Sequence, residues 1–564
     1  MGVRRAVETT IDMVHREAGE ISTFGPLIHN PQVLDLLAEQ GVNILKEIPA
    51  RSTGTVIIRA HGVPPDQKEA LRESGARVQD ATCPRVLKVQ AIIEKFNKQG
   101  YATVIIGDRN HAEVIGLMGY AAPLAHLVSD EADVDRLQLD TPYIIVSQTT
   151  QDKESFQHLS ELILARYPGG RVFNTICDST RKRQEEVKKL CGKVPAVVVV
   201  GGKASANTQR LGEIAENMGC AVFMAETEED LDWQGLARFD RVGVTAGAST
   251  PTWMINRVIC ALEAFPGKGE GVFGTLIFKI LWHLLATNLF VGLCGGLLAY
   301  ACGLLQDIPL DPNNFFMAFG YLFAMHNLNR FTNQDAGKFN DPGRQGFFRR
   351  FQWHLLLISG VTLFFALAVA YSVGLDSFVL LLVMSMLGIL YSVRLVPRAL
   401  SSRIRVSRLK EIPGSKTFFI ALAWASVIVF LPAWSVAAVG PRTLAAFLVV
   451  LGLVFVRNAL YDVFDVQGDR IVGKETLPVC IGEKRTIRLL HVIMAIIFAM
   501  LAIFPSLGLL SRFGYWVMPG LLYLCALTCL YESGWVRHGI KLEFSLETVF
   551  LLTSLSVLLG GLLL

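Results

Sequence analysis

The feature that most constrains this chain of 564 residues is an abrupt change in hydropathy near residue 270. Before it, short β-branched runs alternate with charged, helix-like stretches. After Phe273, long runs of leucine, valine, phenylalanine and alanine follow one another. The two kinds of sequence meet in FPGKGEGVFG, a glycine-rich stretch typical of a linker. We therefore predict a first domain over 1–265, a linker over 266–273 and a membrane domain over 274–564.

The membrane half contains nine apolar segments, most of them near the roughly 20 residues that a helix needs to cross a bilayer. Any one of them is compatible with a buried core helix, but nine in series favour an all-α membrane domain. The positive-inside rule places the basic loops, and with them the first domain, in the cytoplasm. We expect a multi-pass protein of the cell inner membrane. The nine segments are 274–303, 314–326, 353–372, 377–396, 417–436, 441–459, 486–510, 514–531 and 546–564.

One predicted cytoplasmic loop, RNALYDVFDVQGDRIVGKETLP, carries Asp462, Asp465 and Asp469. At helical spacing the three carboxylates share one face, where they repel each other and are costly beside a membrane. A Mg²⁺ ion relieves this repulsion and commonly bridges carboxylates to substrate phosphates. A solvated acidic helix end is the alternative. Lys410 and Lys416 are candidates for holding a diphosphate, although each is also typical of a basic loop.

With these motifs the second half resembles the UbiA superfamily of intramembrane prenyltransferases. The resemblance rests on the apolar spans, on YDVFDVQGDRIVGKETLP as second aspartate motif and on RLK…GSK before an apolar helix. It implies Mg²⁺-dependent transfer from an isoprenoid diphosphate to a lipophilic acceptor. The first aspartate motif departs from the family pattern, since HNLNRFTNQDAGKFND has Arg330 in place of an aspartate. Asn329 and Asn333 lie near the expected diphosphate-binding positions, and the first Mg²⁺ site is weakened or rebuilt.

In the first half, strand-like runs such as GTVIIRAHG, YATVIIGD, PYIIVSQTT and AVVVVGGK each end in a small or polar residue before a helical stretch. This alternation predicts an α/β fold with parallel sheets, in which functional groups gather at the carboxyl ends of strands. In VVVVGGKASANTQRL, Ser205 and Asn207 open a helix after a glycine turn, which favours an anion site. VTAGAST repeats the arrangement with Ser249.

Histidines follow the same strand ends: His29, His61 and His111. A lone histidine is more often a core or surface residue, but three beside two anion loops favour a diphosphate pocket. Glu113 follows two residues after His111 and is a proton-donor candidate, with a surface glutamate as the alternative. Cys83 and Cys177 each precede a basic helix, a position that stabilises a thiolate. Thiolates hold iron–sulfur clusters, although two cysteines alone are too few.

Together these motifs resemble the LytB/IspH family of 4-hydroxy-3-methylbut-2-enyl diphosphate reductases over essentially all of 1–265. The residues that carry the resemblance are GVRRAVE, IHN, AHGV, DATCP, NHAEVIGLMG, SQTT, ICDSTRKRQE, VVGGKASANTQRL and VTAGAST. The family implies three α/β lobes around a 4Fe–4S cluster, with one cysteine from each lobe. It also implies reductive removal of the substrate hydroxyl to give isopentenyl and dimethylallyl diphosphate, with ferredoxin or flavodoxin as electron donor.

The resemblance assigns roles to individual residues. Cys83 and Cys177 match the second and third cluster ligands. The first is expected in GFC-x-GVRRAVE, immediately ahead of Met1, and Cys191 and Cys220 are expected to be core thiols. Glu113 matches the acid that delivers protons, and Thr149 its hydrogen-bonding neighbour. The residues that match diphosphate binders are His29, His61, His111, Ser205, Asn207 and Ser249.

The leading hypothesis is therefore a bifunctional isoprenoid enzyme in the membrane. One alternative is a first half without a cluster, which binds diphosphates or regulates a working transferase. The other is a working reductase on a catalytically weakened membrane anchor. The formal net charge of +4 does not suggest a nucleic-acid partner.

Overall fold

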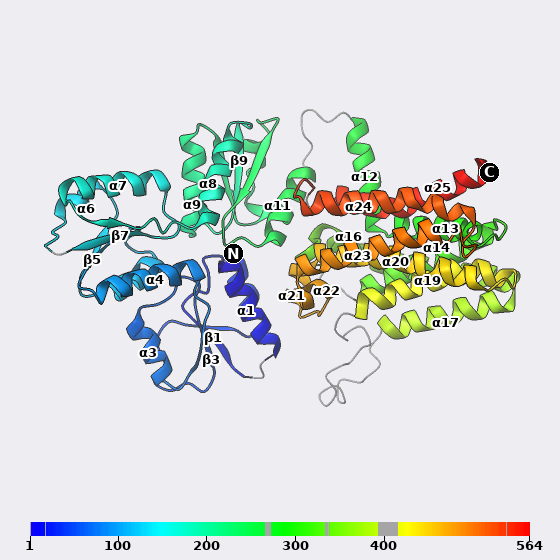
Figure 1. Cartoon of the computed structure of the whole chain (residues 1–564), viewed down its shortest axis with the longest axis horizontal. Coiled ribbons are helices and arrows are strands. Elements are labelled where there is room, and N and C mark those ends of the chain that lie inside the picture. The colour runs from blue at the N-terminus through cyan, green and yellow to red at the C-terminus, as the bar shows by residue number, and fades with distance from the viewer. Residues whose placement is uncertain are drawn as a thin grey trace. The chain divides into compact units, whose positions relative to one another are not determined.

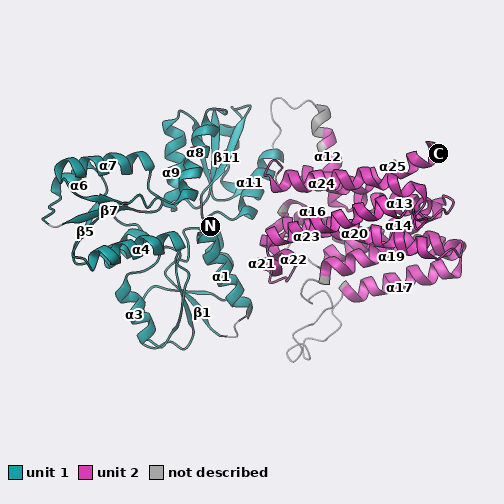
Figure 2. Cartoon of the chain, viewed as in Figure 1, with its two compact units in different colours: residues 1–269 teal, residues 270–564 magenta. Residues whose placement is uncertain are grey.

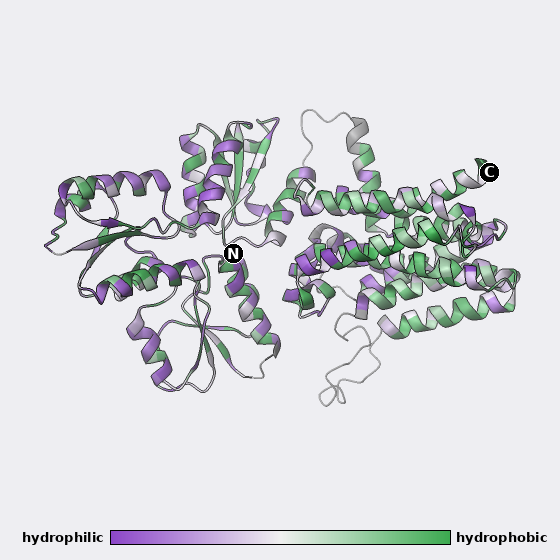
Figure 3. Ribbon diagram, viewed as in Figure 1, coloured by the Kyte–Doolittle hydropathy of each residue, from purple (hydrophilic) through white to green (hydrophobic). Residues whose placement is uncertain are grey.

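The computed structural model of the chain describes residues 2–16, 19–140, 142–264, 272–332, 337, 339–392, 415–536 and 539–563. The chain divides into two compact units, Met1–Gly269 and Glu270–Leu564 (Figure 2). Polar and apolar residues are mixed along the elements of the first unit, whereas apolar residues dominate the helices of the second (Figure 3). The predicted linker lies almost entirely outside the described residues.

The first unit consists of three lobes, each built on one parallel sheet (Figure 1). Sheet order is β2-β1-β3-β4 in the first lobe, β6-β5-β7-β8 in the second and β10-β9-β11 in the third. The predicted three-lobed α/β fold is thus confirmed. The strands are β1 (Ile21–Phe24), β2 (Asn43–Leu45), β3 (Thr55–Ile58), β4 (Arg77–Asp80), β5 (Ala102–Ile106), β6 (Ala125–Val128), β7 (Tyr143–Ser147), β8 (Arg171–Val172), β9 (Ala196–Val200), β10 (Ala221–Ala225) and β11 (Val242–Ala246).

Helices cover both faces of the second and third sheets, which explains their continuous apolar strands. Val197 and Val199 of β9 pack in one core cluster, and Val198 and Val200 in another. This is the two-residue alternation of a strand buried on both sides. The helices are α1 (Gly2–Arg16), α2 (Pro31–Glu39), α3 (Pro65–Glu73), α4 (Pro84–Asn97), α5 (Ala112–Ala121), α6 (Glu131–Arg136), α7 (Lys153–Arg166), α8 (Asp178–Cys191), α9 (Ala206–Asn217), α10 (Trp233–Leu236) and α11 (Thr252–Ala264).

The second unit is a helical bundle, as the sequence predicts. Its helices are α12 (Val272–Ala286), α13 (Leu289–Leu305), α14 (Pro312–Thr332), α16 (Pro342–Val373), α17 (Leu375–Ser392), α19 (Ser415–Ser435), α20 (Pro441–Phe464), α21 (Val466–Ile471), α22 (Leu477–Ile481), α23 (Glu483–Ile503), α24 (Met518–Glu532) and α25 (Ile540–Leu563). Large apolar side chains of α16, such as Phe364, are exposed on the outside of the bundle, which suits contact with lipid.

The predicted count of nine membrane spans is not confirmed. Within the described residues six helices are long and apolar enough to cross a membrane, or seven if a bent pair counts as one span. That pair, Lys279–Ala286 and Leu289–Leu305, turns by 74° next to Asn288, whose φ of 59° interrupts the helix. The apolar helix Leu375–Tyr391 is shorter than the others. Hydropathy alone did not reveal the break at Asn288.

Candidate functional site

The three predicted histidines lie together in the first unit. His29 follows β1, His61 follows β3 and His111 caps α5, so the first two lobes both contribute. Their ring centroids are 4.8 Å apart for His29–His61, 5.3 Å for His61–His111 and 5.9 Å for His29–His111. The nitrogens of these three rings are close enough to share one metal ion or one polyanion.

Burial lowers the pKa of all three histidines. The pKa of His111 falls to about 4, and that of His61 lies well below its ordinary value because the positive forms of its neighbours add to the effect of burial. His29 shifts in the same direction through burial and the nearby Arg59. The Nδ1 of His111 accepts a hydrogen bond from the backbone N–H of Glu113 at 3.2 Å. At neutral pH the cluster therefore consists of uncharged rings, and the Nε2 of His111 carries its proton.

Glu113 is buried, with 1 % of its surface exposed, so it is not a surface carboxylate. One of its oxygens accepts from the backbone N–H of Thr149 at 2.7 Å, and the other from the Thr149 hydroxyl at 2.8 Å. Burial raises the pKa of Glu113 to about 7, although both hydrogen bonds from Thr149 oppose the rise. The pair therefore holds a carboxyl group that can give up a proton near neutral pH.

The two predicted anion loops meet in the third lobe. The hydroxyl oxygens of Ser205 and Ser249 are 3.5 Å apart at the start of α9. Asn207 is buried, and neither atom of its amide has a hydrogen-bond partner among the described residues. A Cβ on Gly202 would lie 2.5 Å from the backbone oxygen of His29, so this loop packs directly on the first lobe. The structure thus brings the serine loops next to the histidines.

Cys83 and Cys177 occupy equivalent positions, as the N-cap residues of α4 and α8, where neither side chain makes a capping hydrogen bond. An ion pair between Arg85 and Asp178 joins the two helix starts. The backbone N–H of Cys83 donates to Ala60, next to His61, and that of Cys177 donates to Thr149, both at 2.9 Å. The two thiols therefore border the same site as the histidines and Glu113.

The N-terminal end of α1 reaches this point as well, in the middle of the three lobes in Figure 1. A Cβ on Gly2 would lie 2.0 Å from the sulfur of Cys83. Both thiols are uncapped at helix starts beside one site, so Cys83 and Cys177 fit ligands of an iron–sulfur cluster. Cys220 instead donates to the carbonyl of Val194 at 3.3 Å, and burial raises the pKa of Cys191 to about 12, as suits core thiols.

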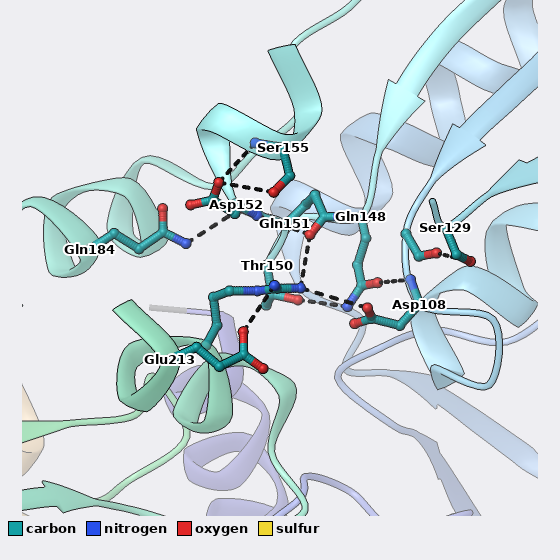
Figure 4. Close-up of polar contacts among 11 residues, drawn as sticks. Asp108, Ser129, Gln148, Thr150, Gln151, Asp152, Ser155, Gln184 and Glu213 are labelled. Atoms are coloured by element: carbon teal, nitrogen blue, oxygen red, sulfur yellow. Dashed lines mark hydrogen bonds and ion pairs between the residues drawn. The ribbon is translucent and has the colours of Figure 1, made fainter. Parts of the chain in front are cut away.

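A polar network that the sequence analysis missed links the second and third lobes (Figure 4). Arg210 of α9 donates to the side chain of Gln151 at 3.1 Å and lies 3.7 Å from the carboxylate of Asp108. The Gln148 side chain accepts from the backbone N–H of Asp108 at 2.8 Å. The sequence does show that Arg210 lies in the helix after the predicted anion loop. It does not show which residues Arg210 contacts, because Gln151 and Asp108 are about 60 and 100 residues away in sequence.

In the second unit the predicted aspartates do not share one continuous helix. Asp462 lies in the last turn of α20, Asp465 separates α20 from α21, and Asp469 belongs to α21. Asp462 is already paired: Lys416 donates to it at 2.7 Å, and the Thr417 hydroxyl donates to its other oxygen. Lys416 thus neutralises an aspartate in this structure.

Asp469 is the aspartate whose surroundings fit a cation. It is buried and lies 3.8 Å from the Lys474 ammonium, and its Oδ2 has no hydrogen-bond partner within the described chain. Burial raises its pKa in spite of Lys416 and Lys474. Since Mg²⁺ prefers carboxylate oxygens and is often held by one or two of them, Asp469 with the neighbouring Asp465 fits a Mg²⁺ site.

Three cavities adjoin in the bundle. Two polar ones of about 220 Å³ each include Asp465 and Glu543. The acidic residues that line only one of them are Asp462 and Glu547 in the first and Asp341 and Asp469 in the second. An apolar cavity of about 340 Å³ lies between α14, α17 and α19. His326 and Asn329 line all three, so a polar head and an apolar tail fit side by side. Asn333 and Lys410, the other predicted diphosphate binders, lie outside the described residues.

Basic groups occupy the region of the altered first aspartate motif. Arg330 donates to the backbone oxygen of Ala286 at 3.1 Å and stacks on Phe348. Arg344 pairs with Asp341 and with Glu543 of α25. Arg457 and Glu547 also line the polar cavity and were missed by the sequence analysis. Their signal was a charge within an otherwise apolar span, which commonly marks a functional group.

Comparisons with known proteins divide the chain in the same way. The LytB protein family model matches residues 1–263, and the UbiA prenyltransferase family model matches residues 289–540. The 4-hydroxy-3-methylbut-2-enyl diphosphate reductase of Geobacter sulfurreducens is 40% identical over 270 residues, which is 48% of this chain and 95% of the relative. The enzyme of the same name from Aquifex aeolicus is 39% identical over 260 residues, or 46% of this chain and 90% of the relative.

Solved structures resemble either half. The E-1-hydroxy-2-methyl-but-2-enyl-4-diphosphate reductase from Plasmodium falciparum is 27% identical, with a TM-score of 0.45, and the match covers 49% of this chain and 86% of that one. A UbiA homolog from Archaeoglobus fulgidus bound to GPP and Mg²⁺ is 16% identical, with a TM-score of 0.37, over 50% of this chain and 96% of that one.

Proposed function

Since the chain belongs to the LytB family through residues 1–263 and carries a UbiA prenyltransferase family domain over residues 289–540, we propose that it is a bifunctional isoprenoid enzyme. Its first unit reduces 4-hydroxy-3-methylbut-2-enyl diphosphate to isopentenyl and dimethylallyl diphosphate. Its second unit transfers a prenyl group to a lipophilic acceptor. The observation that carries the first activity is the pairing of the buried Glu113 carboxyl with Thr149, which is itself hydrogen-bonded to Cys177.

In the reductase, the diphosphate binds between the histidine cluster and the serine loops. Neutral histidines and the hydroxyls of Ser205 and Ser249 donate hydrogen bonds to it, and the free N–H groups at the start of α9 add to them. The Asn207 amide, which lacks a partner among the described residues, is a further donor. An iron–sulfur cluster, for which Cys83 and Cys177 would be two of the ligands, would supply the two electrons, received from ferredoxin or flavodoxin.

Glu113 supplies the proton. With a pKa of about 7 its carboxyl is half protonated at neutral pH, and Thr149 fixes its orientation. Two electrons and two protons convert the substrate into the dehydroxylated alkenyl diphosphate, with the same number of carbons, and one water. The buried position of Glu113 excludes bulk water from the proton donor, so the proton is delivered at the hydroxyl that leaves.

In the transferase, the polar cavities receive the prenyl diphosphate and the apolar cavity receives its hydrocarbon chain. Asp465 and Asp469 would hold Mg²⁺, which would neutralise the negative charge of the departing diphosphate. Lys416, which lines both polar cavities, adds positive charge, and Lys410 is proposed from the sequence as a second cation. We further propose that the chain is a multi-pass inner-membrane protein with its reductase unit in the cytoplasm, because the loops rich in lysine and arginine favour that orientation.

Two variants test the two activities in one purified chain. Glu113→Gln should abolish reduction and leave Mg²⁺-dependent prenyl transfer unchanged, whereas Asp469→Asn should do the reverse. In each variant the activity that is retained shows that the purified chain is still folded and active in its unsubstituted unit. Loss of neither activity, or of both together, would contradict the proposed division of labour.

One observation favours a second candidate function, a working reductase on a weakened membrane anchor. Asp462 is already occupied by Lys416 and Thr417. In the first aspartate motif, Arg330 stands in place of an aspartate and Asp341 is paired with Arg344. The discriminating variant is Asp462→Asn. If the wild-type chain shows no Mg²⁺-dependent prenyl transfer, the anchor is favoured, whereas transfer that is present in wild type and falls in Asp462→Asn favours the transferase.

A further inference from the structure

A buried group of charged and polar side chains from α20 and α25 lines the polar cavity that includes Asp462. Arg457 and Glu547 are 5% and 1% exposed, and they form an ion pair through the Oε1 of Glu547. The Tyr461 hydroxyl donates to the same oxygen at 2.9 Å. Arg457 also donates to the Asn458 side-chain oxygen at 2.7 Å and stacks on Trp424 and Tyr461. These contacts fix each side chain in place.

Three atoms of this group remain without a hydrogen-bond partner anywhere in the described chain. They are the Oε2 of Glu547, the Nδ2 of Asn458 and the Nε of Arg457. All three residues line the same cavity of about 220 Å³. Buried ion pairs stabilise a protein only when their remaining donors and acceptors are satisfied, so a purely structural pair is poorly served by this arrangement. The free atoms comprise one acceptor and two donors.

A hydroxyl group matches this set. It donates one hydrogen bond, which suits the Glu547 carboxylate, and accepts two, which suits Asn458 and Arg457. An ether oxygen has no proton for Glu547, and a carboxylate would be repelled by it. The site therefore discriminates a hydroxyl from its methyl ether.

The location fits a group that meets the prenyl chain. Asn458 precedes Asp462 by one helical turn, which places it about 6 Å farther along α20, away from the aspartates. Trp424, on which Arg457 stacks, also lines the apolar cavity. A ligand bound to Glu547 thus lies beyond the diphosphate end and beside the hydrocarbon end of the proposed prenyl substrate.

We propose that Glu547, Asn458 and Arg457 form the acceptor subsite, and that the acceptor is a lipophilic alcohol or phenol. This rests on the proposed transferase function. During transfer the bond between C1 of the prenyl group and the diphosphate oxygen breaks, and diphosphate leaves with the electron pair. The acceptor oxygen forms the new bond to C1, and its proton passes to the Oε2 of Glu547.

Binding of 4-octylphenol and its methyl ether to the full chain in detergent tests the subsite without requiring turnover. Wild type should bind the phenol at least about tenfold more tightly than the ether, a difference of about 1.4 kcal/mol. Glu547→Gln should reduce this preference to below about threefold. Asp307→Asn is the matched control, because Asp307 also belongs to an ion pair of the second unit but is exposed. It should leave the preference unchanged.

If thermal unfolding shows that Glu547→Gln does not fold, Asn458→Ala tests the subsite instead, because it keeps the ion pair between Arg457 and Glu547. It should lower phenol affinity about threefold to tenfold, because the Asn458 Nδ2 donor is lost, and ether affinity by no more than this, since the ether oxygen accepts the same hydrogen bond. Equal binding of phenol and ether by wild type, an unchanged preference in folded Glu547→Gln, or an unchanged phenol affinity in folded Asn458→Ala would overturn the subsite. Binding of geranyl diphosphate with Mg²⁺ is measured in parallel. Its absence in wild type would refute the proposed transferase while leaving the phenol result to stand.

Discussion

Thr149→Val removes one of the two hydrogen bonds that hold the Glu113 carboxylate. The Thr149 hydroxyl lies 2.8 Å from a Glu113 oxygen, and the backbone N–H, at 2.7 Å from the other, remains in the variant. A hydrogen bond to a charged group contributes about 1.5–3 kcal/mol, and one pKa unit corresponds to about 1.4 kcal/mol. The hydroxyl favours the ionised carboxylate, so its loss should raise the pKa of Glu113 by about one to two units.

The pH dependence of kcat/KM for reductive dehydroxylation reports this pKa, because it reflects ionisations of the free enzyme. Glu113 has a pKa of about 7, and an acid works only while protonated, so wild-type activity should fall above about pH 7. In Thr149→Val the fall should move to about pH 8–9. Thr149→Ser keeps a hydroxyl and should keep the wild-type profile.

Glu113→Gln completes the test, since it cannot donate the proton. It should lower kcat/KM by about 10²–10⁴ and abolish the fall near pH 7. If the Thr149→Val profile coincides with that of wild type, or if Glu113→Gln retains the same titration, Glu113 is not the group that controls the rate.

Three further outcomes are expected. Binding of inorganic diphosphate at pH 6 should be accompanied by proton uptake by His111, because the anion raises the pKa of this histidine from about 4. Calorimetry in buffers of different ionisation enthalpy measures the proton uptake, and zero uptake would contradict the prediction. Gly202→Ala should destabilise the first unit by about 1–3 kcal/mol in thermal unfolding, since its Cβ would lie 2.5 Å from the His29 carbonyl oxygen; an unchanged transition would show that the lobes can separate freely there. Lys416→Met leaves the buried Asp462 without its cation and should cost about 3 kcal/mol, partly recovered by added Mg²⁺; insensitivity to Mg²⁺ would argue against metal binding beside it.

The parts of the reductase site that follow local rules were predictable from sequence. His29 and His61 lie in the loops after two strands of one parallel sheet, which brings such positions to one edge. The place of His111 at a helix start was also predictable, but its contact with the other two histidines joins two lobes. The contact of Gly202 with the backbone of His29 was not predictable, because it joins two lobes and no periodicity encodes it. The same holds for Arg210, whose partners belong to another lobe.

In the membrane unit, hydropathy predicted a helical bundle but not its details. The bend at Asn288 depends on one backbone conformation within an apolar run. The pairing of Asp462 with Lys416 joins residues 46 positions apart. Arg457 and Glu547 were hidden because a single charge changes the mean hydropathy of a span only slightly, although its burial makes it costly.

Reductive turnover measures the central activity most directly. The full chain, with Gly-Phe-Cys added ahead of Met1 to supply the expected third cluster cysteine, is reconstituted anaerobically with iron and sulfide and given 4-hydroxy-3-methylbut-2-enyl diphosphate and a reductant. Isopentenyl and dimethylallyl diphosphate should form, and Glu113→Gln in the same chain should form them at least about 100-fold more slowly. Absence of both products from the reconstituted wild-type site, or equal amounts from Glu113→Gln, would contradict the assignment of this site to the reductase reaction.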